Sequence, residues 1–395
     1  MQINKIILIL LLIIGFASCQ PKEKYDWEVG LSAPKYYSSS PSVRFFYKGK
    51  SVGSASANIG IQPGWVETAG GYASGKEEDE IPDSLHVEWL CGTDRYYYKG
   101  DFVLPRKKMI KFFQNPITNL NGLSREYSLI IVGTAPGGNV TVWLGAGSIL
   151  TEIAKFKAEN TGIWKENDKD YDKYWGNIDD NIKYKNKDFN VYHYLHGIDY
   201  KVWEKGEKEY NYDVGFTSQD GNIKMSLLTF FSKAGTVFQP DTYSETPFTI
   251  DKSQWSKVSY QVNNNIIKKE PLPIMMRVEI LDKKHTNLYF STDVVLPLDF
   301  KKKYLTTYLD TVTNKKENYN RIVIGIYSDY TKGIIWLEGK NKRIKLMGFK
   351  NFIRNKEQEN NYQSGGYSLP KNFEFPKWEG REKLIKPDLE FWQEE

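Results

Sequence analysis

Residues 127–144 read YSLIIVGTAPGGNVTVWL, and residues 319–337 read YNRIVIGIYSDYTKGIIWL. Each stretch has an apolar run, a short segment rich in turn-forming residues and a second apolar run that ends in Trp-Leu. Runs of β-branched and aromatic residues separated by such turn segments predict two strands joined by a turn. The sequence therefore predicts the same β-hairpin twice.

The similarity continues on both sides of these hairpins. LHVEWL, which begins at Leu85, corresponds to MRVEIL, which begins at Met276, and YDWEVG from Tyr25 corresponds to YNYDVG from Tyr210. Four further matches keep a nearly constant offset: Leu104-Pro105 with Leu296-Pro297, Tyr127 with Tyr319, Ile130 with Ile322 and Gly133 with Gly325. Ordered matches of this kind indicate two copies of one module. The alternative is two unrelated β-rich domains with similar patterning.

The fold class predicted from these patterns is mainly β, with β-rich α+β character. Alternation with a period of two indicates half-buried antiparallel strands, so we expect two tandem β-sandwich-like modules. We also expect one covering helix in each module. In the first copy RKKMIKFFQN follows Pro105, and in the second copy LDFKKKYLTTYL follows Pro297. Apolar residues recur at helical spacing in both: Met109, Ile110 and Phe113 in the first, and Phe300, Tyr304, Leu305 and Tyr308 in the second.

Composition shifts along the chain predict its organisation. We expect a signal peptide at 1–18, a tether at 19–24 and the first β-rich module at 25–160. A polar linker or binding insertion follows at 161–209, then the second, diverged module at 210–355 and an irregular tail at 356–395.

The first twenty residues predict export and anchoring. Lys5 precedes the apolar run IILILLLIIGF, which is shorter than the about 20 residues that a spanning helix needs and has the length of a signal-peptide core. The following FASC resembles a bacterial lipobox, which implies acyl chains on Cys19 and the lipid bilayer as a partner. Gln20 follows this cysteine directly, and the residue at that position resembles that of lipoproteins sorted to the outer membrane. The alternative is a plain secretory signal with a chance cysteine.

Composition excludes several classes of protein. The net charge of +5 is spread over 395 residues, whereas a nucleic-acid binder shows a clustered basic face. Two cysteines exclude a disulfide-rich scaffold and a Cys₄ zinc site. Cys91, in the setting VEWLCG, is typical of a small apolar residue on a strand, because no motif supplies the base that a catalytic thiol needs.

Two segments resemble metal sites only in part. The stretch 168–172, DKDYD, has the alternating carboxylates of a calcium loop, but Lys173 stands where an EF-hand needs Gly and Asp179 where it needs Glu. His193 and His196 have a spacing that suits zinc on a helix, but on a strand they would point to opposite faces. We therefore predict no metal site and no cofactor.

No catalytic residue is predicted either. The glycine-rich stretch 135–138, APGG, lies between two strands rather than before a helix, so it indicates a hairpin turn and not a phosphate loop. The many tyrosines and tryptophans are typical of packing between strands, although they could also form a sugar-stacking surface.

Several motifs in the N-terminal half resemble a known family. WEVGLSAPKYY, PGW at residues 63–65, LHVEWL and VGTAPGGNVTVWLG resemble the bacterial lipoproteins grouped as domain of unknown function 2931. The resemblance covers roughly residues 25–159. The second copy departs from it, because SDYTKG replaces TAPGG and it has no PGW. Membership implies a secreted, membrane-anchored protein and implies no established activity.

The function predicted from these observations is binding rather than catalysis. We expect an envelope lipoprotein, in the outer membrane, that acts as a structural or interaction protein with an envelope or effector protein as partner. One alternative is a periplasmic immunity protein against a secreted antibacterial effector. Another is an enzyme acting on envelope polymers, which would need converging carboxylates in a cleft.

Overall fold

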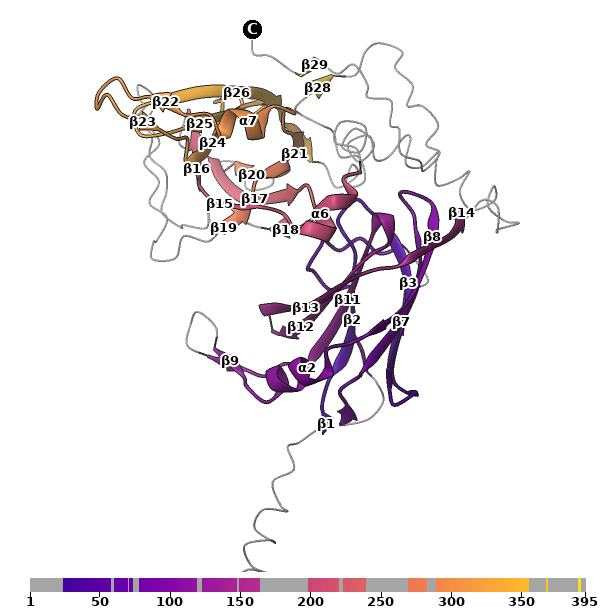
Figure 1. Ribbon diagram of the computed structural model, residues 1–395. Helices are drawn as coiled ribbons and strands as arrows, with labels where there is room; N and C mark the ends of the chain where they lie inside the picture. The colour runs from indigo at the N-terminus through magenta and orange to yellow at the C-terminus, as the bar shows by residue number, and fades with distance from the viewer. Residues whose placement is uncertain are drawn as a thin grey trace, which may run out of the picture.

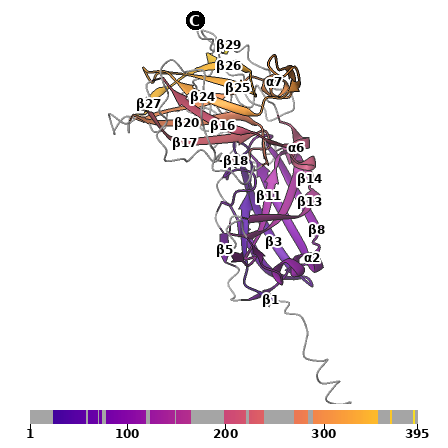
Figure 2. The same ribbon diagram turned by 90° about the vertical axis from the view of Figure 1, so that its left-hand side faces the viewer.

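The structure is a computed structural model in which two β-rich bodies are stacked end to end (Figure 1). The described residues are 24–57, 60–69, 71–73, 78–118, 123–147, 149–163, 198–219, 223–238, 269–282, 289–354, 367–368 and 390–391. Helix α6 (Tyr200–Lys205) lies where the two bodies meet, in both Figure 1 and the view turned by 90° (Figure 2).

The first module contains two five-stranded sheets. One has the order β13-β12-β11-β2-β5 and is built from Ile149–Lys157, Asn139–Ala146, Leu129–Ala135, Glu28–Ser32 and Gly71–Ala73 in that order. The other has the order β14-β8-β7-β3-β4 and is built from Glu159–Ile163, Tyr96–Val103, Ser84–Cys91, Ser39–Tyr47 and Lys50–Ser56.

All strand pairs in these two sheets are antiparallel except β2 with β11, which run parallel. The predicted antiparallel sheets are confirmed, with this one parallel pair as an addition. Four of the five strands of the second sheet and a helix lie between β2 and β11 in the sequence. A connection of that length lets the chain return beside β2 in the same direction.

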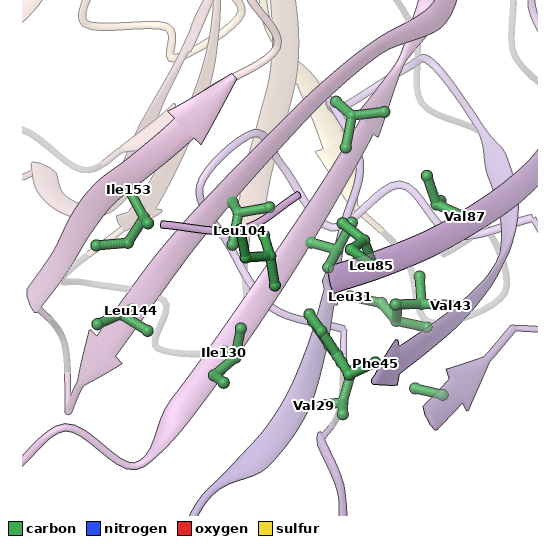
Figure 3. Close-up of a cluster of buried hydrophobic side chains, with 14 of the residues drawn as sticks. Val29, Leu31, Val43, Phe45, Leu85, Val87, Leu104, Ile130, Leu144 and Ile153 are labelled. Atoms are coloured by element: carbon green, nitrogen blue, oxygen red, sulfur yellow. The ribbon is translucent and has the colours of Figure 1, made fainter. Parts of the chain in front are cut away.

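The core of the first module lies between its two sheets (Figure 3). Alternate residues of each strand point inward, because successive side chains of a strand point to opposite faces. One sheet contributes Val29, Leu31, Ile130, Leu144 and Ile153, and the other contributes Val43, Phe45, Leu85 and Val87. The predicted sandwich-like packing is confirmed.

Helix α2 (Arg106–Phe113) covers one end of this sandwich, where Pro105 precedes it as predicted. Its inward face carries Met109 and Phe113, both buried. The ring of Phe113 lies 5.2 Å from that of Tyr25. Tyr25 belongs to β1 (Lys24–Tyr25), which pairs with β6 (Asp79–Glu80). Two short strands, β9 (Ile117–Thr118) and β10 (Ser124–Arg125), follow α2 and pair with each other.

The second module repeats this architecture. One sheet has the order β16-β24-β25-β26, from Asp213–Ser218, Arg321–Ile326, Lys332–Glu338 and Arg343–Lys350, and its β16–β24 pair is again parallel. The other has the order β18-β17-β20-β21-β27, from Val237–Phe238, Ile223–Ser232, Pro273–Asp282, Tyr289–Val295 and Phe352–Arg354. The shared strand order confirms the predicted repeat.

Smaller features recur as well. β15 (Glu209–Asn211) and β19 (Lys269–Pro271) pair as β1 and β6 do, and β22 (Tyr308–Leu309) and β23 (Lys316–Glu317) pair as β9 and β10 do. The register shifts just before Trp143 where β12 pairs with β13, and just before Trp336 where β25 pairs with β26, with the extra residue on β13 and β26. A bulge shifts the register by one residue, so its presence at the same place in both copies marks a shared design.

The second covering helix is shorter than expected. Helix α7 spans only Phe300–Tyr304, and Tyr308 belongs to β22 instead. Leu305, expected on the buried stripe, is 49% exposed. Two β-branched residues, Thr306 and Thr307, follow it, and such residues lose side-chain freedom in a helix.

The described residues of the predicted irregular tail include a short pair, β28 (Tyr367–Ser368) with β29 (Glu390–Phe391).

Candidate functional site

Residues from three of the motifs that resemble the family gather at one end of the first module. The segment Ala33–Tyr37 follows β2, the segment Pro63–Trp65 lies beside it, and Trp143 projects from β12. Tyr37, Trp65 and Trp143 belong to one buried cluster that also contains Phe231, Met275 and Val295 of the second module. We call this apolar cluster, together with the polar contacts around it, the junction. It is the candidate functional site.

The two backbones approach each other closely at the junction. The N–H groups of Lys35 and Trp65 both donate to the carbonyl oxygen of Gly235, at 2.9 and 2.8 Å. Gly235 has a φ of +73°, and a Cβ there would lie 2.6 Å from the Cβ of Pro34 and 2.8 Å from the nitrogen of Lys35. Only glycine fits this position, because any side chain would separate the modules.

Helix α6 holds the β17–β18 turn against the first module. The indole N–H of Trp203 donates to the carbonyl of Ala234 at 2.9 Å, and the ring of Trp203 packs edge-on against Tyr37 at 5.1 Å. The carboxylate of Glu207 accepts the N–H groups of Lys233 and Ala234, each at 3.1 Å. Burial raises the pKa of Glu207, and these hydrogen bonds act in the opposite direction.

Helix α6 lies in the segment predicted to be a linker or insertion, where no helix was expected. Two signals for it are nevertheless present in the sequence. Asp199 caps the helix, since its side chain accepts the N–H of Lys201, and Gly206 ends it with a positive φ. Asp and Gly are typical of these two positions.

A buried ion pair stands beside the apolar cluster. The guanidinium of Arg277 binds both carboxylate oxygens of Asp293, at 2.7 and 2.9 Å, and the Asp293 side chain is 3% exposed. Lys35 reaches this pair from the first module. Burial lowers the pKa of Lys35, the positive charge of Arg277 lowers it further, and Asp293 raises it. The junction therefore has an apolar centre with a charged group from each module at its edge.

A pair of tryptophans forms the first module's side of the junction. The rings of Trp65 and Trp143 meet edge-on with centroids 5.0 Å apart. Trp143 lies flat over Gly133 of the neighbouring strand, where a Cβ would overlap its ring. The second copy has the same arrangement, with Trp336 over Gly325. The sequence matches between these residues are thus explained by packing.

The 135–138 stretch is a turn between β11 and β12, as predicted. A single turn of 3-10 helix (Pro136–Gly138) joins the two strands, and a carboxylate from β7–β8 holds it. Asp94 accepts the N–H of Gly137 at 2.9 Å and the hydroxyl of Tyr98 at 2.7 Å. Asp94 is buried, which raises its pKa, while its hydrogen bonds lower it. No helix begins at this turn, so it lacks the geometry of a phosphate loop.

Cys91 is buried at the end of β7, as predicted for a small apolar residue. Burial and the nearby negative charge of Asp94 raise the pKa of its thiol well above the ordinary value. A thiol in this state is not activated as a nucleophile, because the thiolate is the reactive form.

Several predicted sites lie outside the described residues: Cys19, the 168–172 loop with Lys173 and Asp179, and His193 with His196. Among the residues that the structure does describe, no group of His, Cys, Asp or Glu could hold a metal ion. None of the described helices has the length and apolar character needed to cross a bilayer.

The fold and the junction define a tandem β-sandwich protein whose two modules meet through the motif-bearing end of the first. Residues 17–193 match the family model described as "Protein of unknown function (DUF2931)". The match confirms the resemblance of the N-terminal half and includes the whole first module. No curated protein and no solved structure matches the chain.

Proposed function

We propose that this protein is a lipid-anchored interaction protein of the bacterial envelope, held in the outer membrane by acyl chains on Cys19. The signal-peptide pattern that ends in FASC supports the anchor. Three acyl chains attach a protein firmly, whereas a single myristoyl chain binds a membrane only marginally.

The observation that carries the interaction role is the composition of the junction. Residues of the motifs that resemble the family form a packed contact between the two modules of the chain, with an apolar centre, backbone hydrogen bonds and an ion pair at its edge. These are the features of a recognition surface. The junction therefore supports the proposal that the motif-bearing end of the first module functions in binding.

The position of the N-terminal end of the first module indicates that the second module is held away from the membrane. β1, which follows the tether, lies with α2 at the end of the first module away from α6 and the second module (Figures 1 and 2). A lipid attached just before β1 would hold that end at the bilayer and leave the second module available to partners in the envelope.

The anchor is tested by replacing each cysteine in turn. Cys19→Ala should move the protein from the membrane fraction to the soluble fraction and abolish incorporation of labelled fatty acid. Cys91→Ala is the matched control, since Cys91 is buried inside the first module, and it should keep both properties. Membrane retention of the Cys19→Ala protein would contradict the anchor.

The interaction role is tested separately, by photo-crosslinking in intact cells. A photoreactive residue in place of the exposed Lys345 on β26 of the second module should give discrete protein adducts. The same photoreactive residue in place of Lys99 on β8 of the first module allows the adducts of the two modules to be compared. Absence of protein adducts from both positions would contradict an interaction role.

A further inference from the structure

The chain enters the first module directly beside α2. Lys24 and Tyr25 pair with Glu80 and Asp79, and the Tyr25 ring packs on Phe113 in the last turn of the helix. Figures 1 and 2 both show β1 and α2 at the same end of the module. Whatever holds the N-terminal segment therefore also positions α2.

Covalent geometry limits how far this end can lie from an anchor. Five residue steps separate Cys19 from Lys24, and an extended chain spans at most about 3.6 Å per residue, so the two are at most about 18 Å apart. With acyl chains on Cys19, the α2 end must stay within that distance of the bilayer surface. Charges there act over a Debye length of about 8 Å at physiological ionic strength.

The stretch of chain that contains α2 carries positive charge and no negative charge. Residues 102–125 contain two arginines and three lysines and no acidic residue. Lys107 and Lys111 are one helical turn apart and exposed, while Met109 and Phe113 face the core. Asp101 and Glu126, both exposed, bound the stretch on either side.

The other basic groups of α2 interact with residues of the first module itself. The Arg106 guanidinium donates to the carbonyl of Ile81 and lies over the ring of Tyr47, and the Lys108 ammonium donates to the carbonyl of Ile153. Lys107 and Lys111 are therefore the groups of this helix that can reach an external surface.

Exposed apolar side chains flank the same helix. Val103, just before α2, is 82% exposed, and Leu123, just before β10, is 53% exposed. A basic helix face with apolar side chains at its borders is typical of a surface that rests on the headgroup region of a membrane.

We propose that α2 and its flanking residues, Val103, Lys107, Lys111 and Leu123, bind anionic phospholipid headgroups of the bilayer that holds the acyl chains. This inference rests on the proposed anchor. The contact makes the first module stand on its α2 end, so that the junction and the second module point away from the membrane.

The test uses residues 20–395, which keep every described residue and lack the lipid. This chain should bind phosphatidylcholine vesicles that contain phosphatidylglycerol and not vesicles of phosphatidylcholine alone, with binding that weakens as salt is added. Each lysine at an anionic surface strengthens binding about fivefold. The double variant Lys107→Glu/Lys111→Glu should therefore lower the partition coefficient at least about 20-fold in a sedimentation assay.

The second copy supplies a matched control. Lys302 and Lys316 are exposed lysines on and near α7, the counterpart of α2 at the far end of the molecule. Lys302→Glu/Lys316→Glu should change binding less than twofold. Failure of the wild-type chain to bind phosphatidylglycerol vesicles, or an equal loss in both variants, would overturn the proposal. Neither result bears on the anchor, which the Cys19→Ala fractionation tests alone.

Discussion

Val103 and Val295 occupy the same position in the two modules, each just before a Leu-Pro pair at the end of a strand. Val103 is 82% exposed, and Val295 is completely buried in the junction. The strands are alike, and the difference lies in what covers them. The comparison teaches that the two copies share their inner packing and differ in the surfaces that they use.

The largest expected effect comes from placing a charge at this position. Val295→Asp puts an unpaired carboxylate in the junction and should lower the free energy of unfolding by about 3–5 kcal/mol. Val103→Asp should change it by less than about 0.5 kcal/mol, because the site faces solvent. Guanidinium unfolding followed by tryptophan fluorescence measures both, and equal losses would contradict the assignment of Val295 to a buried contact.

A second comparison uses the ion pairs of the two copies. Arg277 with Asp293 and His86 with Asp101 are cross-strand partners at equivalent register. Asp293→Ala removes the carboxylate that binds Arg277 and should cost about 2–4 kcal/mol, since Asp293 is buried. Asp101→Ala should cost less than about 1 kcal/mol, because Asp101 is 79% exposed. Thermal or denaturant unfolding of the two variants decides the ranking, and the reverse order would refute it.

A third comparison concerns the glycines under the tryptophans. Gly133→Ala and Gly325→Ala each force a tryptophan ring to move, and overpacking of this kind costs about 1–3 kcal/mol. Gly133→Ala should in addition change the near-UV circular dichroism of the Trp65–Trp143 pair. Gly325→Ala should leave that pair unchanged. Wild-type stability of both variants would show that the rings can move freely.

The smallest effect concerns the turns that join the hairpin strands. The pKa of Asp94 is raised above its unfolded value of 3.8, so this group favours the folded state below that pH, and its contribution is lost as the pH rises through the folded pKa. Asp94→Asn should remove this dependence. As the pH rises from 3.8, the free energy of unfolding of the wild type should therefore fall relative to that of Asp94→Asn.

The second copy provides the control for this pH series. Its turn is held from within, by the N–H of Thr331 donating to the exposed Asp329 at 3.1 Å. Asp329→Asn removes an exposed carboxylate from the corresponding turn and is the matched variant. Parallel profiles for wild type and Asp94→Asn would instead show that Asp94 does not couple to folding.

Much of the fold could be predicted because its signals are local. Alternating strands, the turn at 135–138 and the prolines before both helices gave the sandwich class, and constant offsets gave the repeat. The parallel β2–β11 pair was missed because pairing direction depends on a connection of many residues rather than on the strands themselves.

The junction could not be predicted from the sequence. The motifs at Ala33–Tyr37 and Pro63–Trp65 were recognised, but their partner is a turn about 200 residues away. That turn is held by Trp203 of a helix that was not expected and by Glu207 just after the helix. Apolar residues in a strand look the same whether a sheet or another module covers them. The length of α7 was overestimated because its apolar spacing continued past the residues that end the helix.

The junction joins unlike ends of two like bodies, the motif-bearing end of one and the β17–β18 turn of the other. A contact of this heterologous kind does not close on itself and could in principle propagate into a fibre. In the first module, the turn at the equivalent place is Tyr47–Lys50, where Lys48 and Lys50 flank Gly49. Lys233 of the β17–β18 turn corresponds to Lys48, but Lys50 has no lysine counterpart there. Its ammonium group would have to lose water to be buried against a further copy, which opposes growth of the array beyond two units.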